Sequence, residues 1–262
     1  MDSPTILDVS DVTLRFGGVT ALQEASFSLK AGELFAIIGP NGAGKTSIFN
    51  CINGVYRPQN GSILFDGDEL IGESPVSVAR KGVGRTFQNL GLFMNLNLID
   101  NLLLGRHLQM KTGFLSGALW WGRAKNEEIK NRQKIEKIID LLELQPHRYQ
   151  PVGLLPYGIQ KRVELGRALS MEPRILLLDE PVAGMNLEET EDMARYILEI
   201  NNELGISILL VEHDMAMVMD IADIVMALDF GQTIATGSPK DCLLYTSPSP
   251  RDRSLSRMPS SA

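Results

Sequence analysis

A glycine-rich segment, GPNGAGKT at residues 39–46, combines the residue types that bind phosphate groups. It matches the pattern G-x-x-x-x-G-K-[ST], in which glycines let successive backbone N–H groups approach phosphate oxygens closely. We expect Lys45 to reach the β- and γ-phosphates of a nucleoside triphosphate and the Thr46 hydroxyl to coordinate Mg²⁺. The residues expected to bind the nucleotide here are Gly39, Asn41, Gly42, Gly44, Lys45, Thr46 and Ser47.

A pair of acids forms a second candidate catalytic group, directly after the aliphatic run ILLL at residues 175–178. Ligands gather at the carboxyl ends of parallel strands, so Asp179 is a candidate for the Mg²⁺ shell. Glu180 is a candidate general base that orients or deprotonates a water molecule for in-line attack on the γ-phosphate. A solvated strand end is the alternative explanation, and the nearby phosphate-binding motif favours the catalytic one.

Both motifs require strands that end at the same edge of a sheet. The apolar run at residues 33–39 predicts a buried strand before the glycine-rich loop, and residues 46–53 predict a helix after it. From Arg174 onward, apolar strands alternate with helices, which indicates a parallel sheet with crossover helices. Strand-forming segments fill residues 6–38, and helical periodicity marks about 98–170. The expected fold class is therefore α/β with an inserted helical subdomain.

Two of the predicted helices show one apolar face at the i, i+3, i+4, i+7 spacing, which predicts burial of that face. These faces consist of Ile135, Ile138, Ile139 and Leu142 in the first helix and Met193, Ile197, Ile200 and Leu204 in the second.

The bulk composition excludes several classes of protein. A net charge of −7 argues against a nucleic-acid partner, because phosphate backbones select clustered Lys and Arg residues. Cys51 and Cys242 are too few for a disulfide framework and favour a reducing, cytosolic setting. Every apolar run is far shorter than the ~20 residues of a membrane-spanning helix, and we expect no signal peptide.

The composition changes abruptly from Cys242 onward, where Ser, Pro and Arg dominate. The segment CLLYTSPSPRD at residues 242–252 resembles the conceptual translation of a sequencing-library adapter. A natural disordered tail is the alternative. We therefore expect residues 1–241 to form the folded domain and residues 242–262 to be unstructured.

Further motifs occur in the order and spacing of the ABC ATPase family, which the chain resembles over residues 6 to about 241. Gln88, in RTFQN, resembles the Q-loop glutamine, which contacts the metal site and links it to the transmembrane partner. His213, in LLVEHDM, resembles the switch histidine that contacts the γ-phosphate, and residues 183–186 correspond to the D-loop. Phe16 is placed like the aromatic residue that stacks on adenine, a contact worth ~1–3 kcal/mol.

The segment LPYG at residues 155–158 occupies the place of the family's LSGGQ signature. Pro156 replaces a serine whose hydroxyl often contacts the γ-phosphate, and Ile159 replaces the usual glutamine. Backbone donors at Gly158 and the following helix remain, so we expect Pro156, Tyr157 and Gly158 to contact ATP. In the family this segment completes the ATP site of the opposite subunit, so the resemblance implies a dimer.

The resemblance also implies the fold and the chemistry. The expected fold is a P-loop NTPase core with a mixed sheet, an N-terminal antiparallel β subdomain and a helical subdomain that contains the signature. The expected activity is hydrolysis of ATP with Mg²⁺, with Glu180, His213 and Gln88 as catalytic residues and Thr46, Asp179 and Gln88 at the metal.

Within the family, several segments resemble the LivG-type subunit of branched-chain amino-acid importers. They are the tyrosine in the signature, the basic helix KRVELGRAL, the segment EPVAGMN, and a long insertion that includes Trp120 and Trp121, which we expect to pack on the helical subdomain. This resemblance implies a second ABC ATPase subunit of the LivF type, two transmembrane permease chains and, indirectly, a periplasmic binding protein. The chain would then lie peripherally at the cytoplasmic face of the inner (plasma) membrane.

Other functions remain open at this point. The ATPase of a lipopolysaccharide-type exporter has a similar size, but the insertion and the signature tyrosine weigh against it. A urea or amide importer is equally compatible, because the cargo does not touch this subunit. A non-transport ABC protein would need tandem ATPase domains or a coiled-coil insert, and a regulatory module without turnover would not need Glu180 and His213.

Overall fold

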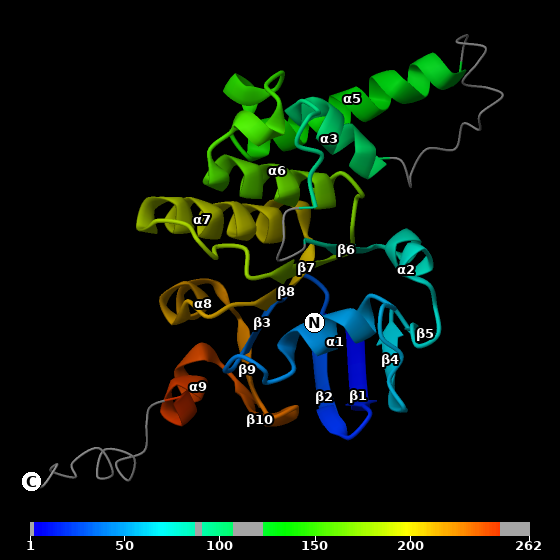
Figure 1. The fold of residues 1–262 in the computed structure, drawn as a ribbon, viewed down its shortest axis with the longest axis vertical. Coiled ribbons are helices and arrows are strands. Elements are labelled where there is room, and N and C mark those ends of the chain that lie inside the picture. The colour runs from blue at the N-terminus through cyan, green and yellow to red at the C-terminus, as the bar shows by residue number, and fades with distance from the viewer. Residues whose placement is uncertain (1–2, 87–90, 107–122, 247–262) are drawn as a thin grey trace, which may run out of the picture.

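The computed structural model describes residues 3–86, 91–106 and 123–246. Gln88, Trp120 and Trp121 lie outside the described residues. The described part is elongated, with helices at one end, a mixed sheet in the middle and an antiparallel sheet at the other end (Figure 1). Within those ranges, no helix combines the length and the apolar character that crossing a membrane requires.

The central sheet has the strand order β10-β9-β3-β8-β7-β6. Its strands β9, β3, β8, β7 and β6 are parallel, whereas β10 pairs antiparallel with β9. The predicted parallel sheet with crossover helices is therefore confirmed. The bounds are β3 Leu34–Ile38, β6 Val83–Arg85, β7 Ile175–Asp179, β8 Ser207–Val211, β9 Ile224–Asp229 and β10 Gln232–Gly237.

Three neighbouring strands of this sheet end at one edge. Val211 of β8 pairs with Ile37 of β3 on one side and with Asp179 of β7 on the other. The glycine-rich loop follows β3, Glu180 follows β7, and His213 comes shortly after β8. The register of the sheet thus brings the three predicted motifs together.

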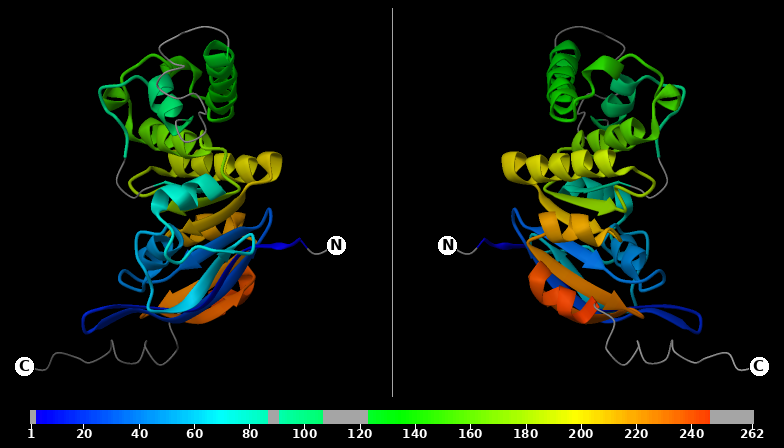
Figure 2. Two further views of the ribbon diagram at one scale, coloured as in Figure 1. Left: turned by 90° about the vertical axis from the view of Figure 1, so that its right-hand side faces the viewer. Right: turned by 90° about the vertical axis from the view of Figure 1, so that its left-hand side faces the viewer.

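A second, antiparallel sheet contains the N-terminal strands in the order β2-β1-β4-β5, as the family resemblance implied. It lies at the lower end of the molecule in Figure 1, and the side views in Figure 2 show the same succession of layers. The bounds are β1 Thr5–Phe16, β2 Val19–Lys30, β4 Asn60–Phe65 and β5 Asp68–Glu69.

The two faces of the central sheet belong to two hydrophobic cores. Leu34, Ala36 and Ile38 of β3 pack into one core, and Phe35 and Ile37 pack into the other. The second core also contains buried residues of the antiparallel sheet and of helix α1 (Lys45–Ile52). Because each buried large aliphatic or aromatic side chain contributes about 1.5–3 kcal/mol, the strand before the glycine-rich loop is firmly fixed.

The helical end of the molecule packs on the first core. Ile135, Ile139 and Leu142 are fully buried and Ile138 is partly buried, so the predicted apolar face is confirmed. The helices before and within this region are α2 Pro75–Lys81, α3 Leu98–Gly105, α5 Arg123–Leu141 and α6 Tyr157–Leu169, with 3-10 turns at Gln145–His147 and Val152–Leu154.

Helix α7 (Leu187–Leu204) crosses from β7 to β8 and begins at a capping box. The Asn186 side chain accepts a hydrogen bond from the Glu189 amide at 3.0 Å, and the Glu189 carboxylate accepts one from the Asn186 amide at 3.1 Å. Of the predicted apolar face, Met193, Ile197 and Ile200 are buried, but Leu204 is 52% exposed. Leu204 is the last residue of the helix, just before the C-cap Gly205, and its exposure shows that the end of the helix extends past the core.

The expected domain boundary at residue 241 stays a prediction; it falls within helix α9 (Pro239–Thr246), and residues 247–262 of the expected tail lie outside the described residues. This helix follows α8 (Met215–Ile221) and the β9–β10 hairpin. Cys242 is buried in the first core, and its thiol donates a hydrogen bond to the Val225 carbonyl at 3.2 Å. A small apolar residue at the start of the compositionally unusual segment therefore packs against β9.

Candidate active site

The glycine-rich loop between β3 and α1 requires glycine at two of its positions. Gly39 and Gly44 have φ angles of 151° and 106°. A Cβ atom at Gly39 would lie 2.1 Å from the Leu228 carbonyl oxygen, and one at Gly44 would lie 2.6 Å from that of Ala21. The loop is also held by the turn between β9 and β10, because the Gly231 amide donates a hydrogen bond to the Ala43 carbonyl at 2.8 Å. Its backbone conformation is therefore accessible only with glycine at both sites.

Helix α1 begins at Lys45 without a side-chain cap, so its first backbone N–H groups are available to an anion. A pocket of about 240 Å³ opens beside this helix start. Gly39 lies outside it and lines a neighbouring pocket of about 360 Å³ together with His213. The lining residues of the first pocket are Ala21, Asn41, Gly42, Gly44, Lys45, Thr46, Ser47 and Glu180.

The ammonium group of Lys45 lies inside the loop. Its Nζ donates hydrogen bonds to the carbonyl oxygens of Gly39 at 2.7 Å and Pro40 at 3.0 Å. Burial lowers the pKa of Lys45, and the carboxylates of Glu180 and Asp179 oppose that shift. The ammonium group is thus bound to neutral carbonyl oxygens. The charged oxygens of a phosphate group would bind it more strongly.

Asp179 is buried at the end of β7 and forms an ion pair with Arg85 of β6. Its Oδ2 accepts a hydrogen bond from Arg85 Nη2 at 2.9 Å, and Arg85 Nη1 donates to Asn50 of α1 at 2.7 Å. Burial raises the pKa of Asp179, and Arg85 opposes that shift. Asp179 Oδ1 is also buried, and no described residue donates a hydrogen bond to it. An unpaired buried carboxylate oxygen beside Lys45 fits a Mg²⁺ site, because Mg²⁺ prefers oxygen ligands.

Glu180 and His213 face each other across the strand ends. His213 Nε2 lies 2.7 Å from Glu180 Oε1. Glu180 has a φ of 50°, an unusual value for a residue with a side chain, and its amide donates to the Val211 carbonyl at 2.9 Å. The structure therefore brings two of the three predicted catalytic residues into contact, while Gln88 lies outside the described residues.

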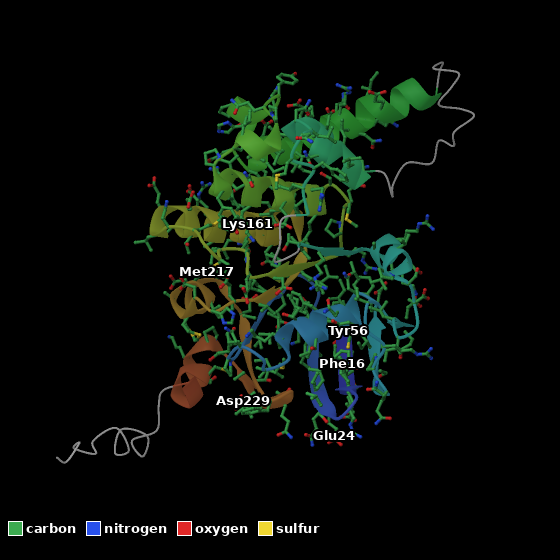
Figure 3. All side chains as sticks on the ribbon, viewed as in Figure 1. Phe16, Glu24, Tyr56, Lys161, Met217 and Asp229 are labelled. Carbon is green, nitrogen blue, oxygen red and sulfur yellow. The ribbon has the colours of Figure 1, made fainter. Side chains whose placement is uncertain are left out.

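Phe16 is 47% exposed at the end of β1, so part of its ring is accessible to a ligand. Its ring meets Tyr56 edge-on, with the ring centroids 5.1 Å apart and the planes at 76° (Figure 3). Tyr56 thus packs against the Phe16 ring.

We expect Phe16→Ala to weaken ATP binding by ~1–3 kcal/mol, because the base loses its stacking partner. This corresponds to an increase in Kd of about 5- to 150-fold. Fluorescence titration with ATP and with adenosine measures the effect, and both affinities should fall. Unchanged affinities would mean that Phe16 is only a packing residue.

The signature segment lies on a different part of the molecule from the glycine-rich loop. Pro156 and Tyr157 are exposed, whereas Gly158 is buried, and none of the three is among the described residues that line the 240 Å³ pocket. A Cβ atom at Gly158 would lie 2.3 Å from Glu189 Oε1. A side chain at Gly158 would therefore have to displace the Glu189 carboxylate, which accepts the Asn186 amide at the start of α7, a constraint that the motif alone does not reveal.

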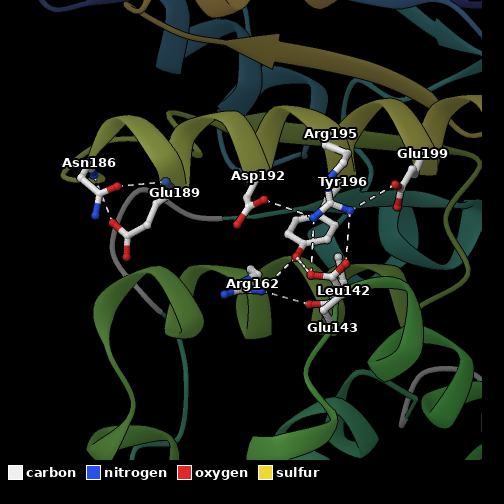
Figure 4. Close-up of polar contacts among 9 residues, drawn as sticks. All are labelled: Leu142, Glu143, Arg162, Asn186, Glu189, Asp192, Arg195, Tyr196 and Glu199. Carbon is white, nitrogen blue, oxygen red and sulfur yellow. Dashed lines mark hydrogen bonds and ion pairs between the residues drawn. The ribbon is translucent and has the colours of Figure 1, made fainter.

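A polar network holds the signature helix α6 to α7 (Figure 4). Arg162 of α6 donates to the Tyr196 hydroxyl at 2.9 Å, and that hydroxyl donates to Glu143 at 2.8 Å. The hydrogen bond from Tyr196 lowers the pKa of Glu143. The Arg195 guanidinium carbon lies 4.5 Å from the centre of the Tyr196 ring. The fully buried Tyr196 therefore anchors the helical end to the core.

We expect Tyr196→Phe to lower the free energy of unfolding by about 1–3 kcal/mol, because Arg162 and Glu143 both lose their buried partner. Urea denaturation followed by circular dichroism measures this. Tyr149→Phe is the matched control at a tyrosine that is 72% exposed, and its effect should be close to zero. Equal stabilities for the two variants would contradict a structural role of the hydroxyl.

The site and the fold define an ATPase built on a phosphate-binding loop. The ABC transporter family matches residues 22–183 of this chain. BraF of Pseudomonas aeruginosa, a high-affinity branched-chain amino acid transport ATP-binding protein, is 39% identical over 238 residues, covering 91% of this chain and 93% of BraF. LivG of Escherichia coli (strain K12), described in the same words, is 40% identical over 241 residues with the same coverage.

A solved structure agrees with the sequence relatives. The ADP conformation of an ATP-binding cassette of an ABC transporter is 27% identical, has a TM-score of 0.80, and covers 97% of this chain and 99% of that one. The chain belongs to the ABC transporter family and is an ATP-binding cassette ATPase.

Proposed function

We propose that this chain is the ATP-hydrolysing subunit of an importer for branched-chain or related amino acids. The observation that supports the ATPase assignment most directly is the convergence of Lys45, Asp179, Glu180 and His213 at the ends of three parallel strands. The amino-acid assignment is supported by the similarity to BraF and LivG over 91% of the chain.

In the proposed mechanism, the loop amides and Lys45 bind the β- and γ-phosphates of ATP, and Phe16 stacks on adenine. When bound, Mg²⁺ would be held by Thr46 and Asp179, with Gln88 as a further candidate, and would neutralise phosphate charge. Glu180 accepts a proton from the attacking water while the water oxygen forms a bond to the γ-phosphorus. The bond from that phosphorus to the bridging oxygen of ADP then breaks.

A second ATPase subunit completes the site in this proposal. The signature residues Pro156, Tyr157 and Gly158 do not line the pocket around Lys45, as far as the described residues show. Pro156 and Tyr157 are exposed, so this segment can meet the nucleotide of an opposite subunit, which we propose to be a LivF-type paralogue. The pair would drive two permease chains from the cytoplasmic face of the inner membrane, with a periplasmic binding protein supplying the cargo.

Reconstitution with the permease and ATPase partners tests the proposal. We expect Mg²⁺-dependent ATP hydrolysis that EDTA abolishes and that a binding protein loaded with leucine stimulates. Stimulation by urea instead of leucine would support an amide importer. Turnover that is coupled to export of a lipid-linked glycan would support an exporter. Permease and binding-protein genes beside this one would favour import.

A further inference from the structure

One buried carboxylate joins the two loops that contain Glu180 and His213. Glu212 is 2% exposed at the end of β8. Its Oε1 accepts a hydrogen bond from the Val182 amide at 3.1 Å, in the loop after β7. Its Oε2 accepts from the amides of His213 at 2.7 Å and Asp214 at 3.3 Å. Each oxygen therefore binds the backbone of a different loop.

This arrangement fixes the backbone on both sides of Glu180. Before it, β7 is paired with β8, and the Glu180 amide itself donates to Val211. After it, the Val182 amide is bound by Glu212. Between these two anchors Glu180 adopts a φ of 50°, in the left-handed region that residues with a Cβ atom rarely occupy. The second anchor acts together with the hydrogen bond from the Ala183 amide to the Glu180 carbonyl at 3.2 Å, which closes the turn itself.

The same carboxylate also fixes the backbone of His213. This amide makes the shortest of the three hydrogen bonds to Glu212. Since the His213 ring is 2.7 Å from Glu180, a shift of either loop would change the distance between the two side chains. Buried carboxylates that accept only backbone amides are effective at setting such distances, because their partners have no rotamer freedom.

We propose that Glu212 is a positioning residue for ATP hydrolysis: it holds the loops of Glu180 and His213 in the register that brings their side chains together. Glu212 does not itself contact the reacting atoms. The inference rests on the proposed role of Glu180 as general base and on the contact between its carboxylate and His213.

Two substitutions at Glu212 distinguish the effect of its hydrogen bonds to both loops from the effect of its negative charge. Glu212→Gln keeps one acceptor oxygen but turns an NH₂ donor toward backbone N–H groups on one of the two loops. Glu212→Asp keeps the charge but is one methylene too short to reach both loops. We expect each to lower kcat by ~10- to 100-fold, since a displacement of about 1 Å can cost that much. The Kd for ATP should stay within about 3-fold of the unmodified protein, because Lys45 and the loop amides are untouched.

Glu69→Gln is the matched control. The Glu69 carboxylate also accepts two backbone amides, from Ile63 at 3.0 Å and Ile71 at 2.9 Å, but both bind its Oε1, and the residue is exposed in the antiparallel sheet. We expect it to leave kcat unchanged. Circular dichroism at the assay temperature, for all variants, verifies that loss of kcat does not reflect unfolding.

A double-mutant cycle with His213→Ala tests whether the effect of Glu212→Gln on kcat depends on His213. A purely structural role of Glu212 would show no such dependence. If Glu212 acts through the Glu180–His213 contact, Glu212→Gln should reduce kcat by no more than about 3-fold once His213 is removed. Full additivity, or a normal kcat in folded Glu212→Gln and Glu212→Asp, would overturn the proposal. If Glu180→Gln is inactive while both Glu212 variants are fully active, only the positioning role fails. If Glu180→Gln is itself active, the proposed general base fails first.

Discussion

Glu180→Gln is expected to abolish steady-state ATP hydrolysis while nucleotide binding persists. The amide has the shape of the carboxylate and retains an oxygen for the contact with His213, 2.7 Å away, but it cannot accept a proton from water. General base catalysis contributes ~10²- to 10⁴-fold, so kcat should fall by that factor. Phosphate release measures turnover, and fluorescence titration measures the Kd for ATP, which should change little.

Glu188→Gln is the control for this experiment, because Glu188 is exposed in the first turn of α7, outside the pocket around Lys45. It should hydrolyse ATP at the normal rate. Unchanged phosphate release from the Glu180 variant would refute the assignment of Glu180 as general base. Loss of binding together with loss of turnover would instead assign Glu180 a role in holding the nucleotide.

The residues that gather around the glycine-rich loop could be predicted because each is fixed by local sequence. The loop follows β3 directly, and Asp179 and Glu180 follow the aliphatic residues of β7, so strand and motif occur in one segment. Parallel pairing then places the carboxyl ends of β3, β7 and β8 at one edge, whatever the details of packing. Local pattern and sheet topology are therefore sufficient for this half of the site.

The supporting residues could not be predicted, because their partners are distant in sequence. Arg85 and Asp179 are 94 positions apart, and Glu212 and Val182 are 30 apart. In the sequence, nothing distinguishes Glu212 from the other acidic residues. Only the pairing of β7 with β8 shows that its side chain is enclosed between two loops. Single-sequence patterns carry no register between strands, so such contacts stay hidden.

The signature shows a different limit, since its glycine has two explanations. The motif predicts that Gly158 contacts ATP of an opposite subunit, which remains a prediction. The structure adds that any side chain there would collide with Glu189, whose position depends on the capping box of α7. Replacement of Gly158 would therefore disturb the capping box of α7 as well as nucleotide contacts, and an inactive Gly158 variant alone could not identify the cause.

Lys45→Ala is the variant for which we expect the largest loss of nucleotide affinity. Its ammonium is already desolvated and bound to the carbonyl oxygens of Gly39 and Pro40, which are weaker partners than phosphate oxygens. Hydrogen bonds to charged groups contribute about 1.5–3 kcal/mol each, so losing one or two should raise the Kd for ATP by ~10- to 10⁴-fold. Titration with ATP and with adenosine measures where the loss arises.

The pattern across ligands distinguishes Lys45 from Phe16. Lys45→Ala should weaken ATP binding and leave adenosine binding unchanged, because adenosine has no phosphate for the ammonium to bind. Phe16→Ala should weaken both. Lys81→Ala is the control, since Lys81 forms ion pairs with Asp68 and Glu73 away from the pocket around Lys45 and should not affect either ligand. Equal ATP affinity for Lys45→Ala and the unmodified protein would show that the loop amides alone bind the triphosphate, and the lysine would then have to act on the transition state, where kcat reports it.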